Sequence, residues 1–349
     1  MASSFKTLTP NDKTSTKTLL HEAIPLTGTL VSGTYSDNNI KTYSHGMFLS
    51  VYDYPYLSSS ANHIFDLATG YASSSPLSGT ISRNQQAKKI NVYNSLAQVL
   101  SGFDITGSVQ EFDQDGNFAA GGTKFKDIFF VNFARLLAKD EIKKGTFSLA
   151  VYASGTYDAP NTTKTITDAG AATSYKVNSP AGEYGILKDD TQGQVGLLFY
   201  QAGVAVLTAS IFGGGPGGPG TLGANAGGAS FDSNHRTLTG SLVSSSIEDV
   251  TNGFRARWKN CSFNNTTELN STIYFCRAMN ADFNYSSNPT YTTASKVFVK
   301  DEPDDLPTSY ITTVGLYSPD NELLAVAKLS EPIKKTPANE LTLRVRLDY

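Results

Sequence analysis

Apolar and polar residues alternate without interruption over the last nine positions of the chain. The apolar members of this run are Leu341, Leu343, Val345, Leu347 and Tyr349. A period of two is the side-chain repeat of a β-strand, in which successive residues point to opposite faces. The pattern therefore predicts a terminal strand with one apolar and one charged face, held in a sheet.

A second strand signal precedes this run. Residues 310–317 and 322–329 are two apolar segments that flank the sequence Ser-Pro-Asp-Asn at 318–321. Proline in the second position of a four-residue turn fixes the backbone angle that the turn needs, and Asp and Asn favour turns. The last forty residues are therefore predicted to form three consecutive strands, of which the first two make a hairpin.

Helical spacing is clearest over residues 84–101. Apolar residues recur there at intervals of three and four, and Gly102 follows as a natural C-cap, with the stripe made by Ala87, Ile90, Tyr93, Leu96, Ala97 and Leu100. We also predict a short helix over residues 134–144, which Gly145 would end.

Further strands are predicted from short apolar runs. Residues 125–133 have the composition of a strand that is buried on both faces, and residues 146–152 resume strand character. Residues 253–259 and 271–278 are interpreted as a pair of strands joined by the polar segment between them.

The segment from Thr191 to Phe231 contains no charged residue. Its apolar part, residues 195–208, has the length of a membrane helix, but Gln201, Ala202 and Gly203 interrupt it and its Val, Phe and Tyr favour strands. We therefore predict a hairpin that turns at 201–203. The glycine-rich part, 213–230, is predicted to be a flexible loop, and it lacks the Gly-Lys-Ser/Thr of a phosphate-binding loop.

Together these patterns predict a mainly β (α+β) protein with antiparallel, sandwich-like sheets, one or two short helices and long loops. Residues 1–20 are rich in Ser, Thr and Lys and are expected to form an extended arm. We expect a β-rich domain over 21–190, which contains the helix near 84–101, and a β-rich C-terminal region over 191–349.

Composition narrows the classes of function. Charged residues make up 17% of the chain, below the roughly 25% of an ordinary soluble domain. A polar surface with few charges suits a protein that neighbours cover, or an extracellular type of β protein, although compositional drift would give the same totals. The net charge is −3 and no window gathers five basic residues, so dedicated nucleic-acid binding is not expected.

The two cysteines, Cys261 and Cys276, are too few for a disulfide scaffold or a cysteine-based zinc site. They lie on the two segments interpreted as paired strands, so they are candidates to face each other across a hairpin. Two free, mostly buried thiols are the expectation for a reducing compartment. The first ten residues lack the apolar core of a signal peptide.

One acidic segment resembles a calcium loop. Residues 113–117 read Asp-Gln-Asp-Gly-Asn, but the glycine precedes Asn117, whereas in the EF-hand pattern it follows the third ligand. The closing position, which needs a bidentate Glu, holds Lys124. We therefore interpret Asp115–Gly116 as a turn and reject a calcium site.

No other motif predicts catalysis. His21, His45, His63 and His235 share no metal-ligand spacing and are expected to be hydrogen-bonded structural residues. The acidic cluster at 301–305 is interpreted as a solvated loop, and the chain contains no Gly-x-Ser-x-Gly motif. We assign no catalytic, cofactor-binding or metal-binding residues and expect no cofactor, no membrane span and no enzymatic activity.

Several segments resemble virion proteins of tailed bacteriophages. They are residues 280–291, 310–317 and 323–349, together with residues 135–145 and the predicted hairpin that begins at Val195. Similar segments occur in tail, baseplate and neck components of phages with long tails, including marine and cyanobacterial phages. That family brings no catalytic residues to this sequence.

The resemblance implies a structural subunit that is made in the host cytoplasm and resides in the virion. Its expected partners are other virion proteins and copies of itself, in a symmetric homo-oligomer or ring. Residues 1–20 and the glycine-rich loop would be the segments that order in the particle. Two alternatives stay open, a receptor-binding or adhesion module of the virion and a virion-associated hydrolase.

Overall fold

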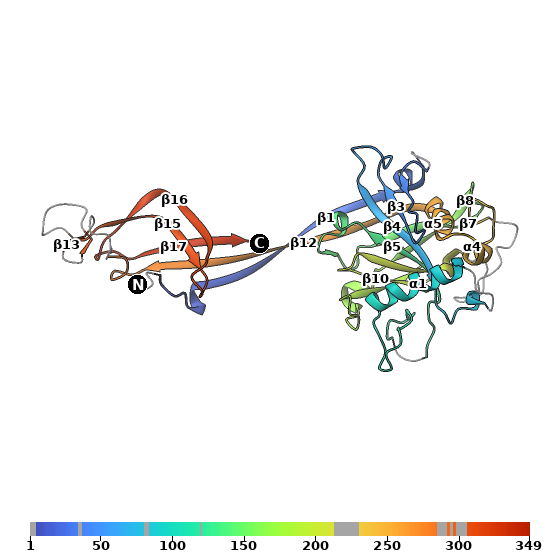
Figure 1. The fold of residues 1–349 in the computed structure, drawn as a ribbon, viewed down its shortest axis with the longest axis horizontal. Helices are drawn as coiled ribbons and strands as arrows, with labels where there is room; N and C mark the ends of the chain where they lie inside the picture. Colours follow the sequence, from blue (N-terminus) through green and yellow to red (C-terminus); the bar gives the residue numbers. More distant parts are fainter. Residues whose placement is uncertain are drawn as a thin grey trace. The chain divides into compact units, whose positions relative to one another are not determined.

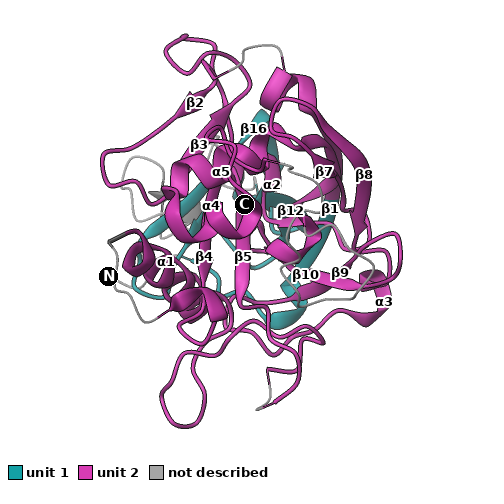
Figure 2. Cartoon of the chain, turned by 90° about the vertical axis from the view of Figure 1, so that its right-hand side faces the viewer, with its two compact units in different colours: residues 1–19, 268–349 teal, residues 20–267 magenta. Residues whose placement is uncertain are grey.

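The computed structural model of the protein describes residues 5–33, 37–79, 84–118, 121–212, 230–284, 292–293, 296–297 and 306–349. The fold is mainly β, with antiparallel sheets and a few short helices, which confirms the predicted class (Figure 1). The chain divides into two compact units (Figure 2). Unit 1 comprises residues 1–19 and 268–349, and unit 2 comprises residues 20–267.

The two units share two long strands. Strand β1 (Lys13–Thr27) and strand β12 (Trp258–Ala278) each contribute residues to both units and neighbour each other in the sheet. The predicted division at residue 190 is therefore not where the units separate. The chain enters unit 2 along β1 and leaves it along β12, so its N-terminal and C-terminal segments together form unit 1.

Within the segment expected to form an extended arm, residues 1–20, strand β1 begins at Lys13. The glycine-rich loop predicted at 213–230 and the acidic loop at 301–305 lie outside the described residues, except for Ser230.

Unit 2 is built on a large curled sheet in which neighbouring strands run antiparallel. Its order is β12-β7-β8-β9-β10-β11-β5-β4-β3-β2, and β6 also pairs with β12 (Figure 2). The strands not yet located are β2 (Ile40–Lys41), β3 (Leu49–Tyr52), β4 (His63–Tyr71), β5 (Asp127–Phe133), β6 (Glu141–Ile142), β7 (Ser148–Gly155), β8 (Pro160–Thr167), β9 (Tyr184–Lys188), β10 (Gln194–Phe199) and β11 (Val204–Thr208).

Both faces of this sheet are buried at its centre. Along β5, Phe129 and Val131 belong to one apolar cluster, while Ile128 and Phe130 belong to a second cluster on the opposite face. A strand that is covered on both sides needs apolar residues at every position rather than at every second one. This explains the unbroken apolar run that predicted a buried strand at 125–133.

The helices of unit 2 are α1 (Asn84–Leu100), α2 (Arg135–Ala138), α3 (Ala171–Ser174), α4 (Leu238–Ser244) and α5 (Ile247–Ala256). Helix α1 confirms the helix predicted at 84–101. Gly102 has a φ of +82°, and its N–H donates to the carbonyl of Ala97 at 3.0 Å, so it closes the helix as predicted.

Helix α1 lies directly against β4 at a glycine. A Cβ at Gly70 would come within 2.5 Å of the carbonyl oxygen of Lys89 and 2.9 Å of the backbone nitrogen of Tyr93. The backbone of the helix therefore sits on the sheet with no side chain between them. On the other face of the sheet, α4 and α5 supply Leu238 and Phe254 to the larger apolar cluster.

The helix predicted at 134–144 is wrong beyond its first turn. Helix α2 ends at Ala138, Lys139 takes a φ of +56°, and β6 follows. Ile142 is fully buried and pairs with Asn265 of β12. Sheet pairing and burial outweigh helical propensity in this segment.

The strand pair predicted from 253–259 and 271–278 is also wrong. Residues 247–256 form α5, whose N–H of Asp249 is capped by the hydroxyl of Ser246. Residues 258–278 form the single strand β12, so Cys261 and Cys276 lie on one strand and do not face each other across a hairpin. Both cysteines are free, as expected.

The hairpin predicted between 195 and 208 is confirmed. Strands β10 and β11 pair antiparallel, and Gly203 turns the chain with a φ of +68° while its N–H donates to the carbonyl of Phe199 at 2.9 Å. In the part of the chain that the structure describes, no helix has the length and apolar character needed to cross a membrane.

Unit 1 contains the three strands predicted at the C-terminus. They are β15 (Ser309–Tyr317), β16 (Leu323–Lys335) and β17 (Leu341–Asp348), and the short pair β13 (Thr292–Thr293) and β14 (Lys296–Val297) lies before them. Strands β15 and β16 form the predicted hairpin. Strand β17 pairs with β12 over eight consecutive residues, from Ser271↔Asp348 to Ala278↔Leu341.

We predict that Gly70→Ala destabilises unit 2 by about 2 kcal/mol, because the added methyl group forces α1 away from β4. The measurement is urea unfolding followed by the fluorescence of Trp258, the single tryptophan of the chain. Gly170→Ala is the matched control, since a Cβ there meets only the Ser174 hydroxyl at 3.5 Å and the backbone φ is −81°. Equal unfolding midpoints for the two variants would contradict the close helix–sheet contact.

Candidate functional site

The C-terminal strand places its two kinds of residue on opposite faces, as its alternation predicts. Leu343 and Val345 stand opposite Cys276 and Tyr274 of β12, and the Val345 side chain is 8% exposed. Arg344, one position away, is exposed. One face of the β12–β17 pair is therefore apolar and partly covered, while its other face carries charge.

Unit 1 has almost no buried apolar residues of its own. Among its described residues, the buried ones are Ser271, Thr272, Ala278, Lys335 and Val345. Both apolar clusters of the structure, by contrast, consist of residues of unit 2. Strands that alternate apolar and polar residues are stable when their apolar face is covered, and here that cover is incomplete.

An exposed apolar surface of unit 1 lies on the β15–β16 hairpin. We call it the hairpin patch, and it consists of Phe5, Tyr317, Leu323 and Val326. Their exposed fractions are 44%, 47%, 53% and 50%, respectively. A cluster of large apolar side chains that stay half exposed marks a surface for another molecule, whereas single exposed apolar residues are ordinary.

A glycine organises the hairpin patch. Gly315 stands opposite Val326 in the hairpin, and a Cβ at Gly315 would come within 2.9 Å of the Tyr317 ring and 3.3 Å of Leu323 Cδ1. The Phe5 ring stacks on the Tyr317 ring, with centroids 5.4 Å apart and an interplanar angle of 12°. Tyr317 and Leu323 therefore lie beside Gly315, Phe5 stacks on Tyr317, and Val326 stands opposite the glycine.

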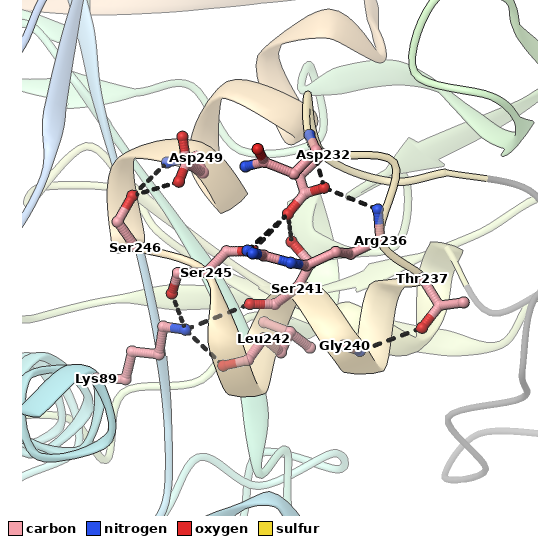
Figure 3. Close-up of polar contacts among 11 residues, drawn as sticks. Lys89, Asp232, Arg236, Thr237, Gly240, Ser241, Leu242, Ser245, Ser246 and Asp249 are labelled. Carbon is pink, nitrogen blue, oxygen red and sulfur yellow. Dashed lines mark hydrogen bonds and ion pairs between the residues drawn. The ribbon is translucent and has the colours of Figure 1, made fainter. Parts of the chain in front are cut away.

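The densest group of buried polar atoms lies in unit 2, where α1 meets α4 (Figure 3). Lys89 is fully buried, and its Nζ donates to the carbonyl oxygens of Leu242 at 2.5 Å, Ser245 at 2.7 Å and Ser241 at 3.4 Å. These carbonyls belong to the last turn of α4 and the residue after it, where helix carbonyls lack partners. The ammonium has three protons and finds three acceptors, so Lys89 caps α4 from α1.

Asp232 organises the other end of the same group. Its Oδ1 accepts the backbone N–H groups of Asn234 at 3.1 Å and Arg236 at 2.9 Å. Its Oδ2 accepts the hydroxyls of Ser241, at 3.1 Å, and of Ser245 (Figure 3). A fully buried carboxylate with four donors is compensated for its loss of water. Lys89 of α1 and Asp232 of the turn before α4 therefore both hold α4 in place through hydrogen bonds.

Burial lowers the pKa of Lys89 to about 8, because the ammonium has lost its water, and the nearby Asp249 carboxylate opposes that shift. The lysine is thus charged at neutral pH and fully engaged with backbone carbonyls. The sequence contains an indication that this lysine is buried, because Lys89 lies four residues before Tyr93 and therefore on the buried stripe of α1. A lysine on an apolar stripe indicates a buried charge with a partner.

The residues considered for metal binding each have protein partners. Lys124, at the closing position of the rejected calcium loop, forms an ion pair with Asp113, and Gly116 makes the predicted turn with a φ of +69°. All four histidine rings make hydrogen bonds, namely His21 to Thr266, His45 to Met47, His63 to Asp66 and His235 to Ser230. Within the described residues, no three His, Cys, Asp or Glu side chains are grouped as metal ligands would be.

Comparison with known proteins adds no identification. No family model, no curated protein and no solved structure matches this chain. The hairpin patch and the incompletely covered strands of unit 1 are therefore the features from which a function is argued.

We predict that the stability of the protein rises between pH 8 and pH 10.5 relative to a Lys89→Met variant. In that interval the unfolded chain keeps the lysine proton, whose pKa is 10.5, while the folded chain releases it near pH 8. Because the unfolded state then binds more protons, the free energy of unfolding increases with pH, by about 3 kcal/mol at most.

Urea unfolding at half-unit steps of pH measures this difference. Subtracting the variant removes the contribution of every other titrating group. A difference between the two proteins that stays constant or falls over the interval would contradict the burial of the Lys89 ammonium.

Proposed function

We propose that this protein is a structural subunit of a bacteriophage particle, in the tail, baseplate or neck, and that it works by protein–protein contact through unit 1. The observation that carries the proposal is the hairpin patch, whose four large apolar side chains are each about half exposed. A surface of this kind is unfavourable in water and favourable when a partner covers it.

The architecture of unit 1 supports the same role. Its β15–β16 hairpin is a separate two-stranded sheet, and such a hairpin is marginally stable in water by itself. Unit 2, with two apolar clusters, has the cover that a stable fold requires. Unit 2 has a complete apolar core and the apolar surface of unit 1 is incompletely packed. This combination suits a subunit that binds its partners through unit 1.

The phage context rests on the resemblance of residues 280–291, 310–317 and 323–349 to virion proteins of tailed phages. Residues 310–317 and 323–349 include the strands β15, β16 and β17, so the resemblance and the exposed apolar surface fall on the same part of the chain. The low charged fraction of 17% agrees with surfaces that other subunits cover.

Adhesion is the second candidate function, and a loop of unit 2 favours it. Tyr54, Tyr56 and Leu57, between β3 and β4, are 46%, 38% and 84% exposed. Exposed aromatic rings suit the apolar faces of sugars. Binding of cell-surface glycans by the purified protein, lost on changing Tyr54 and Tyr56 to Ala, would support adhesion over assembly.

We predict that removing residues 341–349 abolishes incorporation into particles. The truncation takes away all of β17, so β12 loses its eight-residue ladder and the β12–β17 pair loses one of its two strands. The measurement is the amount of tagged chain in gradient-purified particles, determined by immunoblot and located by cryo-EM. Val345→Ile is the control, since it keeps an apolar, β-branched side chain at the buried position.

The buried Trp258 separates assembly from general misfolding, because it lies in unit 2 and is 1% exposed. We expect its emission to stay that of a buried indole in the truncated chain. A truncated protein that still enters particles at the normal level would overturn the proposal.

A further inference from the structure

The hairpin patch lies between charges of opposite sign along the hairpin. Asp320 and Glu322 are exposed in the turn next to the rung formed by Tyr317 and Leu323. Beyond the patch, Lys328 pairs with Thr313 on the next rungs of the hairpin, and Lys334 follows further along β16; both lysines are exposed. The exposed Glu331 lies between these two lysines, so the hairpin is acidic at its turn, apolar at the patch and carries a net positive charge towards its base.

The order of charges along one hairpin is complementary to the order along a second copy that runs in the opposite direction. If a second hairpin lies face to face with the first and runs in the opposite direction, each apolar patch covers the other. The acidic turn of each copy then lies over the lysines of its partner. Two equivalent contacts related by a two-fold axis are the signature of an isologous interface, in which one surface serves both copies.

The size of the patch suits such an interface. Four aromatic or aliphatic side chains, each about half exposed, present on the order of 400 Å² of apolar area. A standard interface buries about 800 Å² per partner, of which a little over half is apolar. The hairpin patch therefore supplies most of the apolar share, and the flanking charges supply orientation.

We infer that the hairpin patch binds a second copy of this chain, in an antiparallel, two-fold arrangement of the β15–β16 hairpins. The inference rests on the proposed role of unit 1 as the docking surface, and it names the partner as the chain itself. A parallel arrangement is disfavoured, because it would bring acidic turn to acidic turn and lysine to lysine.

Charge reversal tests the arrangement. One full-length variant carries Asp320→Lys and Glu322→Lys, and a second carries Lys328→Glu and Lys334→Glu. In the inferred geometry, each variant alone opposes like charges at both contacts, so its self-association weakens about tenfold or more relative to the unchanged chain. The readout is sedimentation equilibrium at low ionic strength, with circular dichroism to establish that each variant is folded.

Mixing the two variants is the decisive step. In a mixed pair, the two lysines of the first variant's turn meet the two glutamates of the second, and the unchanged groups meet at the other contact. Association of the mixture should return to the level of the unchanged chain, a rescue that damage to the fold could not give. Lys143→Glu, which makes the same kind of charge change in unit 2, is expected to leave association unchanged.

Three results would overturn the inference: an unchanged chain that stays monomeric at every concentration, variants that associate as well as the unchanged chain, or folded variants whose mixture fails to associate. If the chain enters particles while any of these results holds, the assembly role stands and the second copy is not the partner. If mixing restores association and no virion contains the chain, the two-fold contact stands and the proposed function fails.

Discussion

The structure depends on one constraint, which is that the apolar faces of its strands must pack against other apolar groups. In unit 2 the central strand β5 has apolar neighbours on both sides, with Phe129 in one cluster and Phe130 in the other. In unit 1 the β15–β16 hairpin leaves Tyr317, Leu323 and Val326 about half exposed. The hydrophobic effect acts equally on both units, so the difference lies in what the chain provides to cover them.

The period of the apolar pattern predicted the elements that are decided locally. The alternation of Leu341 to Tyr349 gave β17, and the three- and four-residue spacing gave α1 with Gly102 at its end. The pattern predicted the wrong element where tertiary contacts, rather than the local sequence, determine the secondary structure. Residues 134–144 have helical composition, but the burial of Ile142 against β12 makes their end a strand, and Ser246 begins a helix where apolar residues suggested a strand.

The candidate surface was less predictable than the fold. Strand alternation shows that Tyr317 and Val326 each lie on a sheet face, but exposure depends on whether another strand covers that face. Phe5 joins the patch from the other end of the chain, by stacking on Tyr317, and no local pattern indicates that contact. Lys89 differs, because its place on the buried stripe of α1 was a readable sign of a capped charge.

The central claim is that the strands of unit 1 gain their cover from other molecules, while those of unit 2 have it already. Hydrogen exchange, measured by mass spectrometry on the free chain and on the same chain in purified particles, tests this most directly. The account predicts rapid exchange of the β15–β16 and β12–β17 amides in the free chain, strong protection of them in the particle, and equal protection of β5 in both. Protection of the β15–β16 amides in the free chain that matches that of β5 would contradict it.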